Sequence, residues 1–502
     1  MQMMSRTSLA SWLRPAISAG TIALLAIAVT AKAQSPAFRW AIKAGGTEDD
    51  AGNAIAVDGS GHAYVIGSFS GAIEFPKQRE PVKLVSKGFS DVFLAKVDNL
   101  GNLMWVKQAG GGFDDYGRGV AVDAEGSCYI TGHYLSTNCV FDSVQLERTG
   151  NSDIFVAKYD SSGNQLWVRN AGAAGGISAH GIAVDTNGNS FITGQYFGKA
   201  TWEAGTLTNI GFADIFVAKY DTEGNFVWAR NAGGPGDDSG NGIAVDAKGN
   251  CFVTGNFSGA ARFGPLTTVA GPGHTALFVA KFDSMGRVTW ASSIKDGPGA
   301  SFGRGVGVDS YGNCYVAGSV NGIMSLGADR GETSTKLPRD KARRRIYVYP
   351  NGGSYVAGSR SDSYVAKFGP KGQLVWSRTG GGIRPTAESA HGIAVDAQGN
   401  SFVTGTFSGR SNFGGANMVS SGISDVFVGQ YDRDGHLIWL RQAGGQSTAP
   451  HCGFGIALDP AGNSYVTGYF HNDTWFGSNL IKSLGEADIF ISRLSGSSIP
   501  LR

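Results

Sequence analysis

The sequence predicts an all-β protein, a seven-bladed β-propeller of four-stranded antiparallel blades that is closed by pairing of the N-terminal and C-terminal strands. Three observations support this prediction. A unit of about 62 residues recurs seven times, each unit contains four short apolar runs, and the two ends of the chain carry complementary parts of one unit. A repeat of this kind is a supersecondary unit that buries its apolar faces only against its neighbours.

A tryptophan marks the same place in every unit. The seven are Trp40, Trp105, Trp167, Trp228, Trp290, Trp376 and Trp439. Successive tryptophans are 61 to 65 residues apart, except for an interval of 86 residues between the fifth and the sixth. The units are therefore in register along the chain, and one of them contains an insertion.

Each unit contains four predicted strands, which we name a, b, c and d. In the unit that begins at Asn241 they are GIAVD, CFVTG, FVAKFD and VTWAS, which are rich in β-branched and aromatic residues. Asp-x-x-Gly links join a to b and c to d, and this pattern predicts tight hairpins. The a to b aspartates are Asp58, Asp123, Asp185, Asp246, Asp309, Asp396 and Asp459. A single active site does not need seven copies, so we interpret them as turn residues.

The chain ends predict closure of a ring. A lone d strand, Phe38 to Ala44, comes first, and a lone c strand, Asp488 to Leu494, comes last. Sheets that are apolar on both faces need cover on both sides, which stacking around an axis provides. Strand d is the expected outer edge, and basic residues that cover the indole and charge this edge follow its tryptophan: Lys107, Arg169, Arg230, Arg378 and Arg441.

The run GIAVDAKGNCFVTG followed by FVAKFDSMG resembles the bacterial β-propeller repeat known as SBBP, and more distantly the NHL repeat. The resemblance covers Phe38 to Leu494. It implies an exported bacterial protein whose family shares no catalytic motif, so it transfers no active-site residue to this chain.

The fifth unit departs from the pattern through an irregular insertion at about 328–362. Within it, Ile346 to Ser359 aligns with an a to b hairpin but lacks c and d strands. We expect this hairpin either to replace the a to b pair of the fifth blade or to flank it, which leaves seven blades. An incomplete eighth blade is the alternative.

The N-terminus predicts export. Arg6 and Arg14 precede an apolar run, and Ala31 to Ala33 forms a small-x-small cleavage site, so residues 1–33 are interpreted as a signal peptide. We expect a mature protein of residues 34–502, a single monomeric domain that is periplasmic, extracellular or on the cell surface. A retained membrane anchor is the competing interpretation, but the run is shorter than the roughly 20 residues that span a bilayer.

Charge and cysteine usage exclude several classes of partner and framework. The expected mature chain has one acidic side chain in excess, and a nucleic-acid partner is not expected because it requires a basic surface. One basic cluster, Lys341 and Arg343 to Arg345, lies in the insertion and is interpreted as a solvated loop. Cys128, Cys251 and Cys314 occupy one position in three repeats, so we expect buried thiols rather than disulfides.

Residues just before strand a are candidates for a ligand-binding ring at the mouth of the central channel. They are Asn53, Arg118, His180, Asn241, Arg304 and His391, with Phe454 in the seventh unit. Such residues either hydrogen-bond to water and neighbouring loops or form a polar ring for an anionic or sugar-like ligand. His180 and His391 belong to nearly opposite blades, so we expect no shared zinc ion.

Aspartate pairs in the d to a loops are weaker candidates. They are Asp49 with Asp50, Asp114 with Asp115, and Asp237 with Asp238. Adjacent carboxylates on a glycine-rich loop could bind calcium, or they could cap turns. Turn capping is favoured, and no cofactor is expected.

The predicted function is a non-catalytic scaffold that binds a protein or glycan through variable b to c segments, such as Phe69 to Ser90. The alternative is a lyase or hydrolase that uses His180, His391, Arg118 and Arg304. Clustering of these four side chains within about 6 Å, with a carboxylate to orient a histidine, would favour the enzyme. Motifs for a zinc protease or a phosphate loop do not occur in the sequence.

Overall fold

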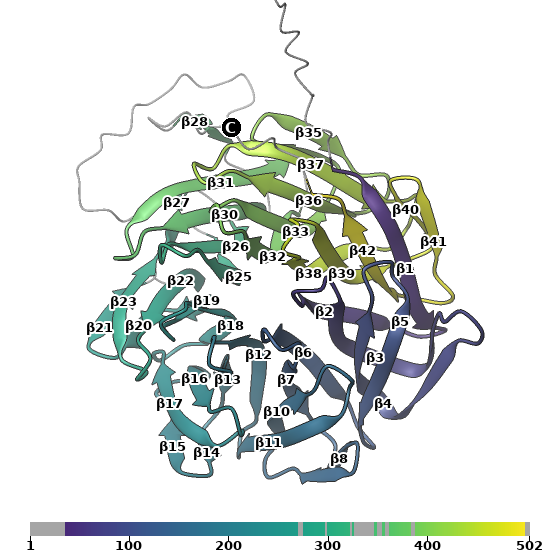
Figure 1. Cartoon of the computed structure of the whole chain (residues 1–502). Helices are drawn as coiled ribbons and strands as arrows, with labels where there is room; N and C mark the ends of the chain where they lie inside the picture. Colours follow the sequence, from purple (N-terminus) through teal and green to yellow (C-terminus); the bar gives the residue numbers. More distant parts are fainter. Residues whose placement is uncertain are drawn as a thin grey trace, which may run out of the picture. The chain divides into compact units, whose positions relative to one another are not determined.

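The computed structural model describes residues 36–269, 275–296, 299–321, 361–382 and 387–496, together with short strands at 324–325, 346–348 and 354–356. These residues form β-strands joined by turns, and none of them lies in a helix. The part of the chain described contains no helix that could span a membrane. Neighbouring strands pair antiparallel throughout the sheets (Figure 1). The all-β, antiparallel prediction is confirmed, while the predicted signal peptide and the basic cluster of the insertion lie outside the described residues.

Six units of the chain each form a four-stranded sheet in the order a, b, c, d. The first two are β2 (Asp50–Val57), β3 (Ala63–Phe75), β4 (Val82–Val97) and β5 (Leu103–Gly110), then β6 (Asp115–Val122), β7 (Cys128–Tyr134), β10 (Ser152–Tyr159) and β11 (Gln165–Ala173). The next two are β12 (Ile177–Val184), β13 (Ser190–Tyr196), β16 (Asp214–Tyr220) and β17 (Phe226–Ala232), then β18 (Ser239–Val245), β19 (Cys251–Ser258), β22 (Thr275–Phe282) and β23 (Val288–Ser293). The last two are β25 (Phe302–Val308), β26 (Cys314–Val320), β30 (Asp362–Phe368) and β31 (Leu374–Gly382), then β32 (Ser389–Val395), β33 (Ser401–Phe407), β36 (Asp425–Tyr431) and β37 (Leu437–Gly444).

The seventh sheet takes its strands from both ends of the chain. It consists of β38 (Cys452–Leu458), β39 (Ser464–Phe470), β42 (Asp488–Leu494) and β1 (Phe38–Gly46). β1 pairs antiparallel with β42, with Ala44 opposite Ile489 and Phe38 opposite Leu494. Ile489 is fully buried by this pairing. The predicted pairing of the two lone terminal strands is therefore present.

The Asp-x-x-Gly links form the predicted tight turns. In the first unit, Oδ1 of Asp58 accepts hydrogen bonds from the backbone N–H groups of Ser60 and His62, both at 2.9 Å. Gly61 follows with φ of +81°, a conformation that costs a side-chain-bearing residue far more than glycine. The aspartate thus satisfies the backbone donors of its own turn, which explains its presence in every unit.

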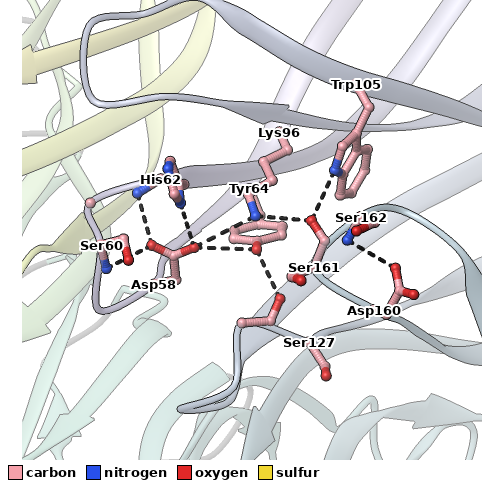
Figure 2. Close-up of polar contacts among 12 residues, drawn as sticks. Asp58, Ser60, His62, Tyr64, Lys96, Trp105, Ser127, Asp160, Ser161 and Ser162 are labelled. Atoms are coloured by element: carbon pink, nitrogen blue, oxygen red, sulfur yellow. Dashed lines mark hydrogen bonds and ion pairs between the residues drawn. The ribbon is translucent and has the colours of Figure 1, made fainter.

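Neighbouring sheets are joined at their outer side by a recurring set of contacts, the outer joint (Figure 2). Between the first and second sheets, Nε1 of Trp105 donates to the carbonyl oxygen of Ser161 at 3.2 Å, and Nζ of Lys96 donates to the same oxygen at 3.0 Å. The hydroxyl of Tyr64 donates to the carbonyl oxygen of Gly126 at 2.8 Å. Each bond ends on a turn of the next sheet, so the tryptophan fixes the spacing between sheets.

The tryptophan bond of the outer joint recurs around the chain. The other donors and acceptors are Trp40 to Asn99, Trp167 to Thr222, Trp228 to Ser284, Trp290 to Pro370 and Trp376 to Arg433. The basic residue after the tryptophan covers the indole as predicted, with the guanidinium carbon of Arg169 5.8 Å from the ring centre of Trp167. Strand d is therefore anchored to the following sheet by both residues.

The sixth sheet differs because the next c to d link is the break between the chain ends. Without that turn, Nε1 of Trp439 donates instead to the side-chain oxygen of Gln430 at 2.5 Å. Gln430 stands where the first sheet has Lys96. A lysine ammonium has no lone pair to offer, whereas a glutamine amide does. Nε of Arg441 reaches the N-terminal segment by donating to the carbonyl oxygen of Pro36 at 2.7 Å.

The segments between strands b and c are hairpins rather than free loops. They are β8 (Asn138–Phe141) with β9 (Val144–Glu147), β14 (Lys199–Trp202) with β15 (Gly205–Thr208), β20 (Ala260–Phe263) with β21 (Leu266–Val269), β34 (Arg410–Phe413) with β35 (Ala416–Val419), and β40 (Asp473–Phe476) with β41 (Asn479–Lys482). β8 pairs with β5, β14 with β11, β34 with β31 and β40 with β37. Four of these hairpins thus add to the d strand of the preceding sheet, which protects part of an otherwise open edge, while β20 and β21 form a separate two-stranded sheet.

The first strands of the sheets lie at the inner side and contact one another in sequence. β2 contacts β6, and the series continues through β12, β18, β25, β32 and β38, which contacts β2 again. Glycine permits this close approach. A Cβ atom at Gly242 would lie 2.6 Å from the carbonyl oxygen of Arg304, and one at Gly455 would lie 2.9 Å from the backbone nitrogen of Ile55.

The predicted extra hairpin of the insertion is present but separate. β28 (Ile346–Val348) pairs with β29 (Ser354–Val356) as a two-stranded sheet. The fifth sheet has its own a and b strands, β25 and β26, so the hairpin does not replace that pair. β24 (Lys295–Asp296) pairs with β27 (Met324–Ser325) near the start of the insertion. All five cysteines are buried free thiols, which confirms the expectation for Cys128, Cys251 and Cys314.

Candidate functional site

The candidate ring residues are the bulged residues of the innermost strands. Strand a loses one residue of register against strand b at each of these positions, for example between Gly52 and Ala54 around Asn53, and between Gly117 and Gly119 around Arg118. The same shift surrounds His180, Asn241, Arg304, His391 and Phe454. A bulge re-aims the side chain of its extra residue. Six of these seven side chains are half-buried and Arg304 is exposed, so solvent reaches them all.

Three ring residues bond to the next sheet. Nδ2 of Asn53 donates to the carbonyl oxygen of Gly117 at 2.8 Å, and Nδ2 of Asn241 donates to that of Gly303 at 2.8 Å. Nδ1 of His180 lies 3.0 Å from the carbonyl oxygen of Gly240. Because a carbonyl oxygen only accepts, this nitrogen carries the proton. These three side chains brace neighbouring inner strands, as the structural interpretation of the ring expects.

Arg118 makes no such bond. Its guanidinium carbon lies 5.0 Å from the ring centre of Tyr116, and its Nε is buried without a hydrogen-bond partner. Tyr116 lies directly across the strand pair from His133, with ring centres 5.1 Å apart. Nδ1 of His133 is also buried without a partner. We call Arg118, Tyr116, His133 and His180 the Arg118 cluster.

Burial and the charge of Arg118 keep both histidines of the Arg118 cluster neutral at pH 7. Burial, and then the charges of Arg118 and His180, lower the pKa of His133 to about 3. Burial also lowers the pKa of His180 to about 4, against the hydrogen bond to Gly240, and Arg118 contributes in the same direction as burial. The guanidinium of Arg118 is therefore the one cation of the cluster at neutral pH.

The four residues proposed for an enzyme separate into two arginine–histidine pairs. Arg118 acts on His180 of the following sheet, and Arg304 acts on His391 of the following sheet. Burial first, and then Arg304, lower the pKa of His391 to about 3, and its ring packs 5.3 Å from that of Phe454. Within the described residues neither histidine is hydrogen-bonded to a carboxylate, so the arrangement that would favour an enzyme is not found there.

The aspartate pairs cap turns with their second member. Asp50 accepts hydrogen bonds from the N–H groups of Gly46 at 2.9 Å and Ser70 at 3.2 Å. Asp115 and Asp238 make the equivalent bonds, to Gly111 at 2.8 Å and to Gly234 at 2.6 Å. All three are almost completely buried. This favours turn capping over calcium binding, and the described residues contain no group of three or more potential metal ligands.

Burial raises the pKa values of these capping carboxyl groups, against the opposing effect of the hydrogen bonds they accept. The pKa of Asp50 rises to about 8, and those of Asp115 and Asp238 rise to about 6. Asp488, at the start of β42, also has a pKa raised to about 6 by burial, and its charge contributes to the shift at Asp50. The pairing of the chain ends therefore buries two carboxyl groups that keep a proton at higher pH than a free aspartate does.

Sequence reasoning missed the side chains that neighbour the ring. Ser239 donates through Oγ to Oδ1 of Asn241 at 2.9 Å, and Nδ2 of Asn241 donates to Oδ1 of Asn256 at 3.1 Å. Ser239 and Tyr116 precede their ring residues by two positions, and Asn256 and His133 follow the glycine of strand b. A register comparison of strands a and b could have identified these positions.

A groove of about 800 Å³ lies at the outer side, away from the ring, between the second and third sheets. Lys107, Asp142, Trp167, Arg169 and Glu223 are among its lining residues. The tryptophan and the arginine belong to the outer joint, which recurs in most units. The groove therefore has a structural origin, and we place the candidate site at the inner ring.

Comparisons with known proteins identify the repeat. The SBBP β-propeller repeat matches residues 166–195 and 227–256. An uncharacterized WD repeat-containing protein of Acanthamoeba polyphaga mimivirus is 23% identical over 80% of this chain and 34% of its own. The regulatory protein FlaEY of Caulobacter vibrioides is 26% identical over 33% of this chain and 17% of its own. The chain thus spans about a third or less of the length of these curated relatives.

Solved structures show weaker likeness. A gluconolactonase from Xanthomonas campestris is 12% identical, with a TM-score of 0.33, over 76% of this chain and 86% of its own. The calcium-binding protein regucalcin from Agrobacterium tumefaciens is 11% identical, with a TM-score of 0.29, over 77% of this chain and 92% of its own. Neither likeness bears on the chemistry of the inner ring.

Proposed function

We propose that this β-propeller repeat protein, whose chain carries SBBP repeats, is an exported, non-catalytic scaffold that binds a protein or glycan at its inner ring. In this proposal seven blades form a closed ring, and the mature protein acts as a monomer in the periplasm, outside the cell or on its surface. The pairing of β1 with β42 and the cyclic series of contacts from β2 through β38 back to β2 support closure.

The observation that carries the proposed binding role is the variation at the seven bulged positions. The outer joint keeps its tryptophan in every unit, whereas the bulged residue is asparagine, arginine, histidine or phenylalanine. These bulged side chains remain accessible to solvent. Asn53, His180 and Asn241 also bond to the next sheet, but neighbouring strands that are alike do not account for the variation, and a ligand is the partner we propose.

The binding role is favoured over the lyase or hydrolase alternative by the state of the two histidines. His180 uses Nδ1 to brace the next sheet, and His391 packs against Phe454. A general base of the histidine type is ordinarily oriented by a carboxylate or a similar acceptor and has a pKa near the working pH. Both histidines have pKa values far below this range.

The test is a glycan array and a pull-down on isolated cell envelopes with purified residues 34–502. We expect saturable binding that weakens when Asn241 and Arg118 are both changed to alanine. The matched control is Arg169→Ala at the outer joint, which should bind as the wild type does. Binding that is unchanged by the inner-ring variant but lost in the control would contradict the proposed location.

Export and oligomeric state have separate tests. N-terminal sequencing of the secreted protein should start at Gln34, because Ala31 to Ala33 forms the predicted cleavage site. A start well upstream of Ala31 would contradict the proposed signal peptide. Light scattering of the purified protein should give the mass of one chain.

A further inference from the structure

We propose that the Arg118 cluster is a binding site for an oxyanion, the carboxylate or phosphate group of an anionic ligand. This proposal rests on the proposed binding function and deepens it by naming the ligand chemistry and the sheets that bind it. The site lies between the second and third sheets, because β6, β7 and β12 supply its residues.

The first argument is an unbalanced cation. Arg118 forms no ion pair with any described residue, and its closest recorded partner is the face of Tyr116. Burial lowers the pKa of Arg118, which shows that its charge is poorly solvated. Charged groups taken from water are normally compensated by a counter-charge and hydrogen bonds. An anionic ligand would supply both.

The second argument is a surplus of hydrogen-bond donors. Arginine offers five N–H donors in a planar fork that matches the oxygens of a carboxylate or phosphate. Nε, one edge of that fork, is buried without a partner in Arg118, and Nδ1 of His133 is likewise without a partner. Tyr116 lies between these two side chains and packs against both. The cluster thus places an unused guanidinium N–H and an unpartnered imidazole nitrogen beside one aromatic ring.

The third argument comes from the equivalent position in other sheets. Asn53 and Asn241 occupy the same bulge, and each donates to the next sheet at 2.8 Å. The bulge therefore does not by itself leave a side chain unused. Arg304 provides the closest comparison, because it is also a bulged arginine and the bulged residue of the following sheet is again a histidine, His391. The residue two positions before Arg304 is Phe302, and Phe302 lies opposite Ser319 on the paired strand. Arg304 therefore lacks the tyrosine–histidine pair that accompanies Arg118.

The aromatic ring favours a ligand with an apolar face beside its anionic group. Tyr116 and His133 present two neighbouring rings that are tilted by 35° to each other, and the faces of sugar rings pack against aromatic side chains. An anionic sugar such as D-galacturonate is therefore the first probe, inorganic phosphate is the second, and neutral D-galactose is the comparison. Burial, and then the charge of Asp114, raise the pKa of Tyr116.

The experiment is isothermal titration of residues 34–502 with each probe at constant ionic strength and pH 7. We expect D-galacturonate to bind at least tenfold more tightly than D-galactose, since a charged hydrogen bond contributes roughly 1.5 to 3 kcal/mol. Arg118→Gln should reduce D-galacturonate affinity by about tenfold or more, and Arg118→Lys should restore it only in part because the planar fork is lost. Phosphate binding with the same Arg118 dependence would assign the site to phosphate-bearing ligands.

Two controls separate the outcomes. Arg169→Gln, at the outer joint, should leave D-galacturonate affinity within about twofold of wild type. The melting temperature of Arg118→Gln should equal that of wild type because no described bond of Arg118 braces a neighbouring sheet. Failure of both anions to bind wild type, or equal affinity in Arg118→Gln, would overturn the oxyanion site. If glycan-array or envelope binding nevertheless survived in Arg118→Gln, the scaffold function would stand without this site.

Discussion

The outer joint and the inner ring are parts of the same repeat, but the residue type is constant at the outer joint and varies at the inner ring. At the outer joint, six tryptophans donate to a carbonyl oxygen in a turn of the next sheet. At the inner ring, asparagine, arginine, histidine and phenylalanine share one bulged position. The outer residue meets a turn of constant shape, whereas the contacts of the inner residue differ: Asn53, His180 and Asn241 bond to the next sheet, and Nε of Arg118 has no partner. Constancy among repeats therefore identifies structural contacts, and divergence identifies the candidate site.

The sixth sheet strengthens this interpretation because its neighbour is different. Trp439 lacks a turn to bond, and Gln430 replaces the usual lysine to accept its N–H. The acceptor of the tryptophan N–H therefore changes only in the sixth sheet, where the following sheet has no c to d turn. The inner ring changes from sheet to sheet although its neighbouring strands are alike, which points to a partner outside the repeat.

The largest expected effect comes from breaking the seam between the chain ends. Deletion of Phe38 to Ala44 removes the strand that pairs with β42 and leaves buried Ile489 beside open backbone groups. We expect destabilisation of more than about 4 kcal/mol, measured as a large fall in melting temperature or loss of folded protein. Arg39→Ala, an exposed substitution on the same strand, is the control. Equal melting of the truncated and intact proteins would contradict the role of this seam.

The second prediction breaks one outer joint without touching the seam. Trp228→Ala should destabilise the protein by about 3 to 5 kcal/mol, because the indole is buried and its Nε1 donates to the carbonyl oxygen of Ser284 at 3.3 Å. Thermal melting with circular dichroism measures the effect. Val227→Ala changes the adjacent, exposed residue and should cost less than about 0.5 kcal/mol. Similar losses in both variants would show that the joint has no special importance.

The third prediction restores the usual residue of the repeat where its partner is missing. Gln430→Lys should destabilise the sixth sheet by roughly 1 to 3 kcal/mol, because Nε1 of Trp439 loses its acceptor and remains buried. The matched control is Lys158→Gln in the second sheet, where Trp167 already bonds to Thr222. Melting of Gln430→Lys at the wild-type temperature would refute the explanation of this exception.

The smallest expected effect is the pH dependence of the seam. Asp50 has a pKa raised to about 8 in the folded protein, so folding binds a proton between the unfolded pKa, near 4, and pH 8. Its stabilising contribution is complete at low pH and is lost as pH rises toward 8. Below about pH 6.5 the lowered pKa values of His133, His180 and His391 act in the opposite direction.

The clear window for this effect is therefore pH 6.5 to 8. We expect stability to fall there by at most about 1.4 kcal/mol per pH unit, the value for one proton. Melting temperatures measured across the window test it, and Asp50→Asn, which does not titrate, should show a flatter profile. A wild-type stability that rises across this window would contradict the raised pKa.

The repeat pattern was sufficient to predict strands, turns and the terminal pairing. Alternating apolar residues and Asp-x-x-Gly links act within about 15 residues, so they are visible in the sequence. Asn53 and its counterparts were expected just before strand a, whereas the structure places them within it as bulged residues. Their roles were not predictable, because hydrogen bonds such as that from Asn53 to Gly117 join residues 64 positions apart. The b to c segments were expected to be variable loops, and pairing with the preceding sheet makes most of them hairpins instead.

The sequence alone determined the all-β class, the repeat and the complementary terminal strands, because period, turn chemistry and chain order are local properties. Only the tertiary structure decided which polar residues brace neighbouring sheets and which are unused. Asn241 and Arg118 occupy equivalent positions in the repeat, yet Asn241 reaches the carbonyl oxygen of Gly303 while Nε of Arg118 remains without a partner. That difference depends on the length and direction of each side chain relative to the next sheet, which the sequence pattern does not contain.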